Sequence, residues 1–201
     1  MTAASIKSRP VFAGLCIAPH AKRHLFALEG DGAVALQEQA SSCGREFLSS
    51  AEILYVAGGL QPLVCANLLK ELRPRNFWQA PSIATLLNRL RTTLTTATMG
   101  TRLYVAGTEG FIGQVMQVAM EFGMDPASII TEHRGSLARR VQCVHCKGIT
   151  DDVTANPFTC SHCGLALFVR DHYSRRIGAF QGVNIDAETP GTVPPARELY
   201  P

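Results

Sequence analysis

The sequence has little charge and few aromatic rings. Charged residues make up 17% of its 201 residues, aromatic residues make up 7%, and the formal net charge is only +3. A chain that binds nucleic acid or an anionic membrane through charge is expected to carry a large excess of lysine and arginine. The composition therefore argues against both kinds of partner.

The sequence also lacks an apolar run of the length that a membrane span needs. The longest stretch, residues 53–69, is interrupted by Gly58-Gly59 and by Gln61-Pro62. The apolar run 11–18 is short for an export signal, and no small-residue cleavage site follows it. We therefore predict a cytoplasmic protein without a membrane partner.

The sequence does contain enough apolar material for a folded core. Hydrophobic residues make up 46% of the chain and the mean hydropathy is +0.09, which excludes a disordered chain. Of its seven cysteines, Cys16, Cys43 and Cys65 stand alone and four form two close pairs. A disulfide scaffold would be smaller and more evenly punctuated. We expect a reducing compartment, with the three single cysteines as small core residues.

A strand–turn–helix pattern occurs twice in the first two thirds of the chain. Apolar runs at 53–57 and 103–106 each end in a glycine turn, and helical patterns follow at 62–72 and 111–122. A further helix is predicted at 81–95 and a short strand at 129–130. Strands that alternate with helices indicate right-handed βαβ units and a parallel sheet.

The first fifty residues have a different pattern, which is typical of a β-rich segment. We predict a strand at 11–18 and a hairpin at 24–36, with Gly30-Asp31-Gly32 as its turn. After residue 136 the paired cysteines begin, and residues 165–169 are typical of a strand. The predicted domains are 1–136 (α/β), 137–183 (a four-cysteine subdomain) and 184–201, a Pro- and Thr-rich extended tail that is ordered only if something holds it.

The paired cysteines predict a metal site. Cys143 and Cys146 form one C-x-x-C unit, Cys160 and Cys163 form the other, and thirteen residues separate the two. This doubled spacing is a strong signal for four thiolates around one ion, and the glycines Gly148 and Gly164 can supply the positive φ of each turn. Four thiolates form a closed tetrahedral site that suits structural Zn²⁺.

Other interpretations of these cysteines stay open at the level of sequence. An iron centre of the rubredoxin type uses the same four ligands. A Rieske cluster needs one cysteine and one histidine from each pair; His145 fits, but Cys163 stands where the second histidine belongs. Disulfides are rare in the cytosol. We interpret His145 and His162 as neighbours of the site, with Arg139, Arg140 and Lys147 close enough in sequence to offset its negative charge.

The glycine turns after the two apolar strands are candidate phosphate-binding loops. Turns of this kind bring phosphates to helix N-termini in α/β sheets. No G-x-G-x-x-G is present, however, and Glu109 would face a phosphate with the wrong charge. The simpler interpretation is that these glycines only make tight turns.

Three segments of the chain resemble two known families. Residues 53–72 and 103–132 resemble the first and last βα units of the nucleotide-binding domain of ferredoxin-reductase-type flavoenzymes, in a degenerate copy with a shortened first turn and Ala106 in place of a cysteine. Residues 141–182 resemble the C-terminal zinc-ribbon segment of the small subunit of dimethylamine monooxygenase. The pieces that carry this resemblance are the two cysteine pairs, Phe158, Gly164 and the run from Asp171 to Ser174.

The second resemblance implies a function. It implies an accessory subunit of an NADPH-dependent haem monooxygenase complex that demethylates dimethylamine to methylamine and formaldehyde. It also implies two partners, a haem oxygenase subunit and a reductase subunit with flavin and [2Fe–2S], and leaves this chain with Zn²⁺ and no catalytic residue. The adjacent Asp171 and His172 are not expected to form a catalytic dyad, since neighbours on a strand point to opposite faces. With Arg170, Arg175 and Arg176 they are expected to form a polar edge that contacts a partner, or otherwise a solvated surface.

Two other functions remain possible from the sequence. A stand-alone zinc ribbon that binds nucleic acid or another protein would use Arg139, Arg140, Arg175 and Arg176, but the weak net charge disfavours nucleic acid. A free-standing nucleotide-binding enzyme would need a cluster of acid, base or nucleophile, and none is apparent in the sequence.

Overall fold

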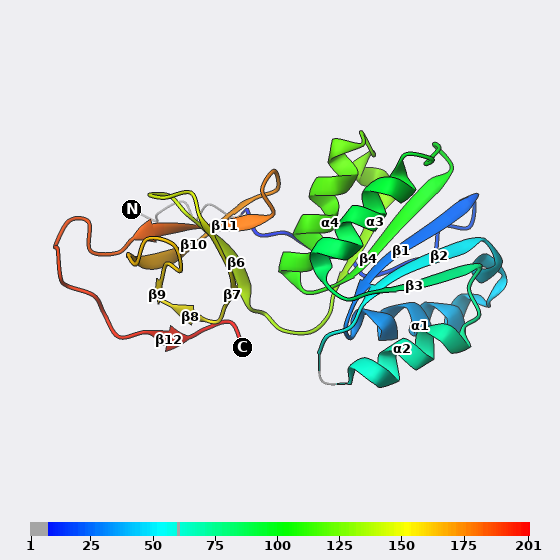
Figure 1. The fold of residues 1–201 in the computed structure, drawn as a ribbon, viewed down its shortest axis with the longest axis horizontal. Coiled ribbons are helices and arrows are strands. Elements are labelled where there is room, and N and C mark those ends of the chain that lie inside the picture. The colour runs from blue at the N-terminus through cyan, green and yellow to red at the C-terminus, as the bar shows by residue number, and fades with distance from the viewer. Residues whose placement is uncertain (1–7, 60) are drawn as a thin grey trace. The chain divides into compact units, whose positions relative to one another are not determined.

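The computed structural model describes residues 8–59 and 61–201, which form two compact units (Figure 1). The first unit is Phe12–Gly135, and the second is Ser136–Pro201 together with the described residues that precede Phe12. The domain boundaries expected from the sequence stay a prediction. Within the part of the chain that the structure describes, no helix is both long and apolar enough to cross a membrane.

A five-stranded parallel sheet forms the centre of the first unit. Its strands lie in the order β3-β2-β1-β4-β5, and every neighbouring pair is parallel. The α/β fold class with a parallel sheet is therefore confirmed. The strands are β1 (Arg23–Glu29), β2 (Ala51–Val56), β3 (Asn76–Ala80), β4 (Thr101–Gly107) and β5 (Ile129–His133).

Helices cover both faces of this sheet (Figure 1). Helices α1 (Gly32–Cys43) and α2 (Pro62–Glu71) pack on one face, and α3 (Ile83–Leu94) and α4 (Glu109–Glu121) pack on the other. Two short 3₁₀ turns, Glu46–Ser50 and Pro126–Ser128, lead into β2 and β5. Each face of the sheet thus has its own cluster of buried apolar side chains, which is the main source of stability in an α/β layer.

The predicted hairpin at 24–36 is wrong. Residues 24–28 of β1 are fully or almost fully buried, because β1 lies at the centre of the sheet between β2 and β4. After Gly30-Asp31 the chain enters α1, where Ala33, Leu36 and Ala40 recur every three or four residues and face the core. Alanine is the best helix former, so this short apolar run is helical although it can be mistaken for a strand.

The predicted strand at 11–18 is also wrong. The structure assigns no strand there; the segment is held instead by single hydrogen bonds to the sheet. The amide of Gly14 donates to the carbonyl of Thr131 (3.2 Å), and the amide of Leu15 donates to the Glu132 carboxylate (2.6 Å). The apolar side chains Phe12 and Leu15 pack against the two core clusters, which explains an apolar run without a strand.

The two similar runs of sequence, residues 53–57 and 103–106, lie in β2 and β4, on either side of β1. In β4, the Tyr104 hydroxyl accepts a hydrogen bond from the amide of Ala18 (3.1 Å), so its proton is free for Nδ1 of His24, 2.9 Å away. Burial lowers the pKa of His24 and raises that of Tyr104. This buried pair is therefore uncharged at neutral pH.

The second unit is built on a smaller sheet with strand order β7-β6-β11-β10-β9. These strands are β6 (Arg139–Cys143), β7 (Ile149–Val153), β9 (Phe158–Thr159), β10 (Ala166–Ser174) and β11 (Ala179–Asn184). The β-rich region with its four cysteines, expected after the parallel sheet, is thus confirmed. Its main buried cluster is small and consists of Val141, Val153, Val169, Tyr173, Phe180 and Tyr200.

The segment predicted to be an extended tail returns to this second unit. Strand β12 (Arg197–Glu198) pairs antiparallel with β8 (Ala155–Asn156). Tyr200 is only 9% exposed and belongs to the small core. The sequence offers no apolar periodicity in this segment, so a single buried ring near its end was not foreseen.

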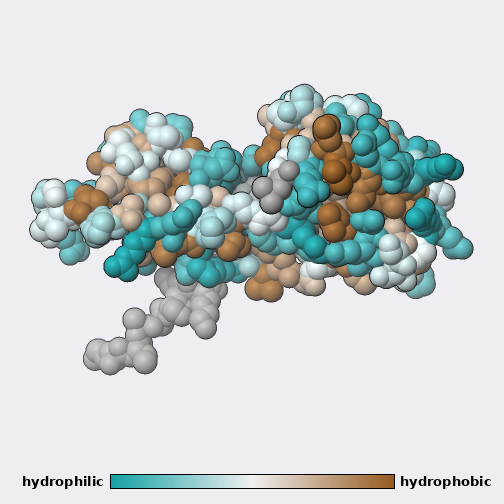
Figure 2. Space-filling view, turned by 90° about the horizontal axis from the view of Figure 1, so that it is seen from below, coloured by the Kyte–Doolittle hydropathy of each residue, from teal (hydrophilic) through white to brown (hydrophobic). Residues whose placement is uncertain are grey.

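The first unit exposes apolar side chains at the start of α2. Leu63 is 78% exposed and Val64 is 57% exposed, because Cys65, Ala66 and Leu69 occupy the face that turns to the sheet. Seen from the side of α1 and α2, this unit shows apolar surface among hydrophilic groups (Figure 2).

Candidate functional site

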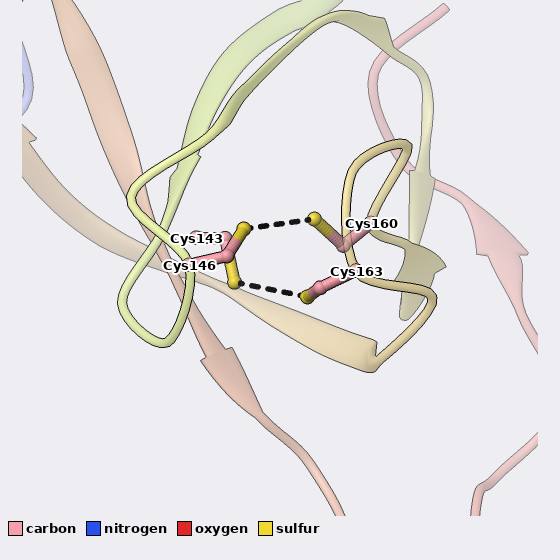
Figure 3. Close-up of side chains that lie close together, drawn as sticks. All are labelled: Cys143, Cys146, Cys160 and Cys163. Atoms are coloured by element: carbon pink, nitrogen blue, oxygen red, sulfur yellow. Dashed lines mark hydrogen bonds between the residues drawn. The ribbon is translucent and has the colours of Figure 1, made fainter.

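The four paired cysteines come together in the second unit. Cys143 ends β6 and Cys146 follows in the next turn, while Cys160 and Cys163 lie in the turn between β9 and β10. Their four sulfur atoms converge (Figure 3) and all lie within 4.8 Å of one another. Sγ of Cys143 is 3.9 Å from Sγ of Cys163, and Sγ of Cys146 is 3.7 Å from Sγ of Cys160.

These distances fit one four-thiolate metal site. With Zn–S bonds of about 2.3 Å, tetrahedral geometry places the sulfur atoms about 3.8 Å apart. A disulfide would require about 2.05 Å. The group therefore could hold a metal ion, and the two separations of 3.7 and 3.9 Å are close to that value.

Both cysteine turns have the same backbone geometry. The amide of Lys147 donates to the carbonyl of Cys143 in the first turn, and the amide of Gly164 donates to that of Cys160 in the second, each at 3.0 Å. Both donors have a left-handed backbone, with φ of 63° at Lys147 and 75° at Gly164. Glycine supplies this conformation in the second turn as expected, but in the first turn Lys147 adopts it and Gly148 does not.

Gly148 is required for another reason. A side chain at this position would collide with the ring of His162. Nε2 of that ring lies 2.8 Å from the carbonyl oxygen of Ile149, the first residue of β7. Since a carbonyl only accepts, Nε2 carries the proton, and His162 joins the second cysteine turn to the start of β7 through a hydrogen bond.

The cysteines differ in exposure and in acidity. Cys143 and Cys160 are buried, whereas Cys146 is exposed. Burial raises the pKa of Cys160, but hydrogen bonds from the backbone amides of Cys163 and His162 outweigh it and lower the pKa below its usual value. A backbone hydrogen bond lowers the pKa of Cys163, but contacts with the other three cysteine sulfurs outweigh it and raise that pKa. Without an ion, the group therefore favours a thiolate at Cys160 and a thiol at Cys163.

Of the three basic residues expected to offset the charge of the site, only Lys147 lies in a cysteine turn, where Nζ donates to the carbonyl of Val144 (2.6 Å). Arg140 pairs with Asp151 (2.7 Å) and Arg139 pairs with Asp171 (2.9 Å). Proximity in sequence did not predict these pairings.

The guanidinium of Arg139 lies between two aromatic rings. It stands 4.0 Å from the ring centroid of Phe180 and 4.0 Å from that of Tyr200. Burial raises the pKa of Asp171, but hydrogen bonds from Arg9 and Arg139 outweigh it and lower the pKa. Asp171 thus belongs to this ionic cluster, which argues against a catalytic dyad with His172.

The second candidate region is the carboxyl edge of the parallel sheet. Its strand order reverses between β1 and β4, and open α/β sheets hold ligands at such a point. Here Glu29, the last residue of β1, occupies the start of α4. One oxygen of its carboxylate accepts hydrogen bonds from the amide (2.9 Å) and the hydroxyl (2.7 Å) of Thr108.

Two glycines allow the backbone segments at this edge of the sheet to pack closely. A side chain at Gly32 would collide with the carbonyl of Ala106, so α1 begins directly against the end of β4. A Cβ atom at Gly107 would lie 2.7 Å from Cβ of Glu29. Glu109 was expected to repel a phosphate here, which stays a prediction, and the structure adds Glu29 as a further carboxylate at the start of α4. In the sequence, the signal for this role of Glu29 is its position directly before the glycine turn Gly30-Asp31-Gly32.

The three single cysteines are not all core residues. Cys65 is buried, but Cys16 and Cys43 are exposed, which corrects the expectation for those two. Burial and the nearby Asp31 carboxylate raise the pKa of Cys65, and burial also raises that of Tyr55 beside it. A thiol that keeps its proton at neutral pH is a poor nucleophile.

Two family models match the chain. Residues 4–129 match the N-terminal domain of the DmmA-like subunit of dimethylamine monooxygenase, and residues 140–183 match the C-terminal domain of the same subunit. The first match alone covers more than half of the chain.

One curated protein is also similar, the "Heme-dependent oxidative N-demethylase delta subunit" of Ectopseudomonas mendocina (strain ymp). It is 38% identical over 110 residues, which are 55% of this chain and 63% of that protein. The match thus spans less than two thirds of the relative.

Among solved structures, similarity is weaker. The flavohaem-like FAD/NAD-binding domain of nitric oxide dioxygenase from Vibrio cholerae covers 63% of this chain and 56% of its own, at 16% identity and a TM-score of 0.41. An intact type IV self-sufficient cytochrome P450 monooxygenase covers 88% of this chain and 22% of its own, at 14% identity and a TM-score of 0.45. At these TM-scores, neither similarity bears on ligand or activity.

Proposed function

This chain belongs to the DmmA-like family of dimethylamine monooxygenase subunits, and on that premise we propose that it is an accessory subunit of an NADPH-dependent haem monooxygenase complex. The complex would convert dimethylamine to methylamine and formaldehyde. The haem oxygenase subunit and a reductase subunit with flavin and [2Fe–2S] are its partners, and the redox chemistry belongs to them. This chain supports the assembly and carries no catalytic residue.

The accessory role is supported mainly by one contact at the carboxyl edge of the sheet, where the Glu29 carboxylate accepts hydrogen bonds from the amide and the hydroxyl of Thr108. The N-terminus of α4 is the position that would favour a phosphate through its free amides and helix dipole. A carboxylate of the chain itself already satisfies the amide of Thr108 there and repels a second anion. In this proposal the fold keeps the frame of a nucleotide-binding domain, and the start of α4 no longer offers an open anion site.

The cysteine group supports a structural role in the same way. Four thiolates from Cys143, Cys146, Cys160 and Cys163 would complete the coordination of Zn²⁺ and leave no position for water or substrate. Bound there, the ion supplies stability to a unit whose apolar core is small.

The alternative functions have less support. Arg139 and Arg140, two of the four arginines on which a nucleic-acid surface would depend, are engaged with Asp171 and Asp151. A nucleotide-binding enzyme is disfavoured by the Glu29 carboxylate at the start of α4 and by the raised pKa of the buried Cys65 thiol, which makes it a poor nucleophile.

Reconstitution tests the proposed function. We expect the haem and reductase subunits, purified without this chain, to assemble poorly and to turn over dimethylamine slowly, and we expect the purified chain to restore both. The Cys43→Ser variant, altered at an exposed single cysteine, should restore them equally well. Full assembly and full turnover without the chain would contradict the accessory role.

Calorimetry with NADPH tests separately whether the carboxyl edge of the parallel sheet binds a nucleotide. The isolated chain should show no measurable heat of binding at moderate salt, because Glu29 occupies the anion position. A dissociation constant in the low micromolar range would contradict this account of the sheet edge.

A further inference from the structure

The Pro- and Thr-rich segment that joins β11 to β12 is held at both of its ends. At its start, the amide of Ile185 donates to the carbonyl of Ala166 (3.0 Å). At its end, β12 pairs with β8, and the amides of Leu199 and Tyr200 both donate to the carbonyl of Thr154 (2.9 Å each). In Figure 1 the segment leaves β11, loops away from the sheet and returns beside β8. It is an anchored loop.

The anchor at the end of the loop is strong for so short a strand. The Tyr200 ring is buried against the guanidinium of Arg139, whose other face lies on the ring of Phe180. Cation–π contacts stabilise more strongly when the cation is desolvated, and Arg139 is buried. The loop is therefore tied to the core and not only to the edge of the sheet.

Hydrogen bonds order the first half of the loop. The carboxylate of Asp186 accepts from the amide of Gly191 (2.9 Å), and its carbonyl accepts from the amide of Thr189 (3.2 Å). The amide of Thr192 in turn donates to the carbonyl of Thr189 (3.1 Å). These bonds fold residues 186–192 into consecutive turns.

The second half of the loop is rigid for a different reason. In Val193-Pro194-Pro195 the proline rings fix φ, and a residue that precedes proline is restricted to extended conformations. Such a run favours the polyproline II helix. All residues from 187 to 199 are exposed, and Val193 is 45% exposed, so an apolar ridge of fixed shape faces solvent.

The chemistry of the ridge restricts its partner. Residues 189–196 contain no charged side chain, whereas nucleic acids and anionic membranes are recognised through cations. Exposed polyproline II segments are bound by grooves lined with aromatic rings, at a low entropic cost because the segment is already extended. We infer that the loop 187–196 docks into an aromatic-lined groove on a partner subunit of the complex; this inference rests on the proposed function.

Deletion of residues 186–201 would be a poor test, since it also removes β12 and Tyr200 from the core. The sharper variant replaces residues 187–196 with a Gly/Ser sequence of equal length and keeps both anchors. A second variant has the same replacement but retains Val193-Pro194-Pro195. The control is Pro62→Ala, which removes an exposed proline from the first unit.

The measurement is the affinity of the full chain for the purified haem and reductase subunits, with metal content and melting temperature recorded for each variant. We expect the full replacement to weaken binding roughly tenfold or more while metal content and melting stay unchanged, and we expect the retained prolines to restore most of the affinity. Pro62→Ala should bind as the parent does.

Two outcomes would overturn the inference in distinguishable ways. If the parent binds its partners and the full replacement binds equally well, the interface lies elsewhere while the proposed function stands. If the parent chain binds neither subunit, the proposed function fails and the inference fails with it.

Discussion

In the unit formed by Phe12–Gly135, two clusters of buried side chains lie on opposite faces of a parallel sheet, whereas the unit that contains Ser136–Pro201 has a main cluster of six buried residues and a group of four cysteines. Apolar burial is sufficient to hold an α/β layer of the first kind. A core as small as the second needs additional links. Two units of one chain are thus stabilised by different means.

The units also differ in whether their folded state needs a bound ion. In the first, the Glu29 carboxylate accepts a hydrogen bond from the Thr108 hydroxyl at the start of α4, and on the proposed function we expect this unit to fold without a ligand. In the second, the cysteine sulfur atoms stand at the separation of metal ligands, so we expect the fold to be complete only with an ion. The two units should therefore respond differently to substitution, and the largest response is expected at the cysteines.

Removal of one thiolate should have the largest effect. We expect Cys160→Ser to lose the metal and to make residues 139–184 sensitive to protease, while fluorescence of Trp78 in β3 still reports a folded first unit. Metal analysis and limited proteolysis measure the two effects. In Cys43→Ser both should be unchanged, and a Cys160→Ser chain that keeps its metal would refute the ligand assignment.

A cavity in the first unit should give the converse pattern. Leu86 on α3 is fully buried, so Leu86→Ala should lower the free energy of unfolding by about 2–5 kcal/mol. Urea titration followed by Trp78 fluorescence measures this loss. The metal content should stay at the parental level; its loss would mean that the second unit depends on the first.

The Tyr200 anchor should have a smaller effect on the second unit. Without the ring, Arg139 loses one of its two aromatic contacts, and we expect Tyr200→Ala to cost about 2 kcal/mol. The rate at which a chelator removes the metal should rise. Tyr200→Phe keeps the ring and should behave as the parent; an equal loss in both variants would place the effect outside the ring contact.

The smallest predicted effect depends on pH. Burial lowers the pKa of His24, so below its unfolded value of about 6.5 the unfolded chain binds more protons, and the first unit loses up to about 1.4 kcal/mol per pH unit until the folded pKa is reached. Urea titrations at several pH values between 8 and 5, followed by Trp78 fluorescence, measure the slope. His24→Gln should flatten it, and an unchanged slope would assign it to another group.

The sequence was sufficient to predict much of the first unit. Helices α2, α3 and α4 and strands β2 and β4 follow from apolar periodicity and glycine turns, because both signals are local. Helix α1 was missed because the run from Ala33 to Leu36 fits a strand as well as a helix over so few residues. Edge strand β3 was missed because most of its residues are only partly buried or exposed, so it lacks an apolar pattern.

The cysteine group was predictable for the same reason, since one short C-x-x-C spacing defines each of the two turns. What the sequence did not indicate are pairings between distant residues. Glu29 meets Thr108 across the sheet, and Tyr200 meets Arg139 from the far end of the chain. Such contacts depend on the strand order, which periodicity alone does not determine.

Amide hydrogen exchange on the intact chain, with and without a strong metal chelator, tests the contrast between the two units most directly. We predict that the chelator abolishes protection in residues 139–184 and leaves the protection of β1, β2 and β4 unchanged. Protection that stays intact in both units after the metal has been removed would contradict the account.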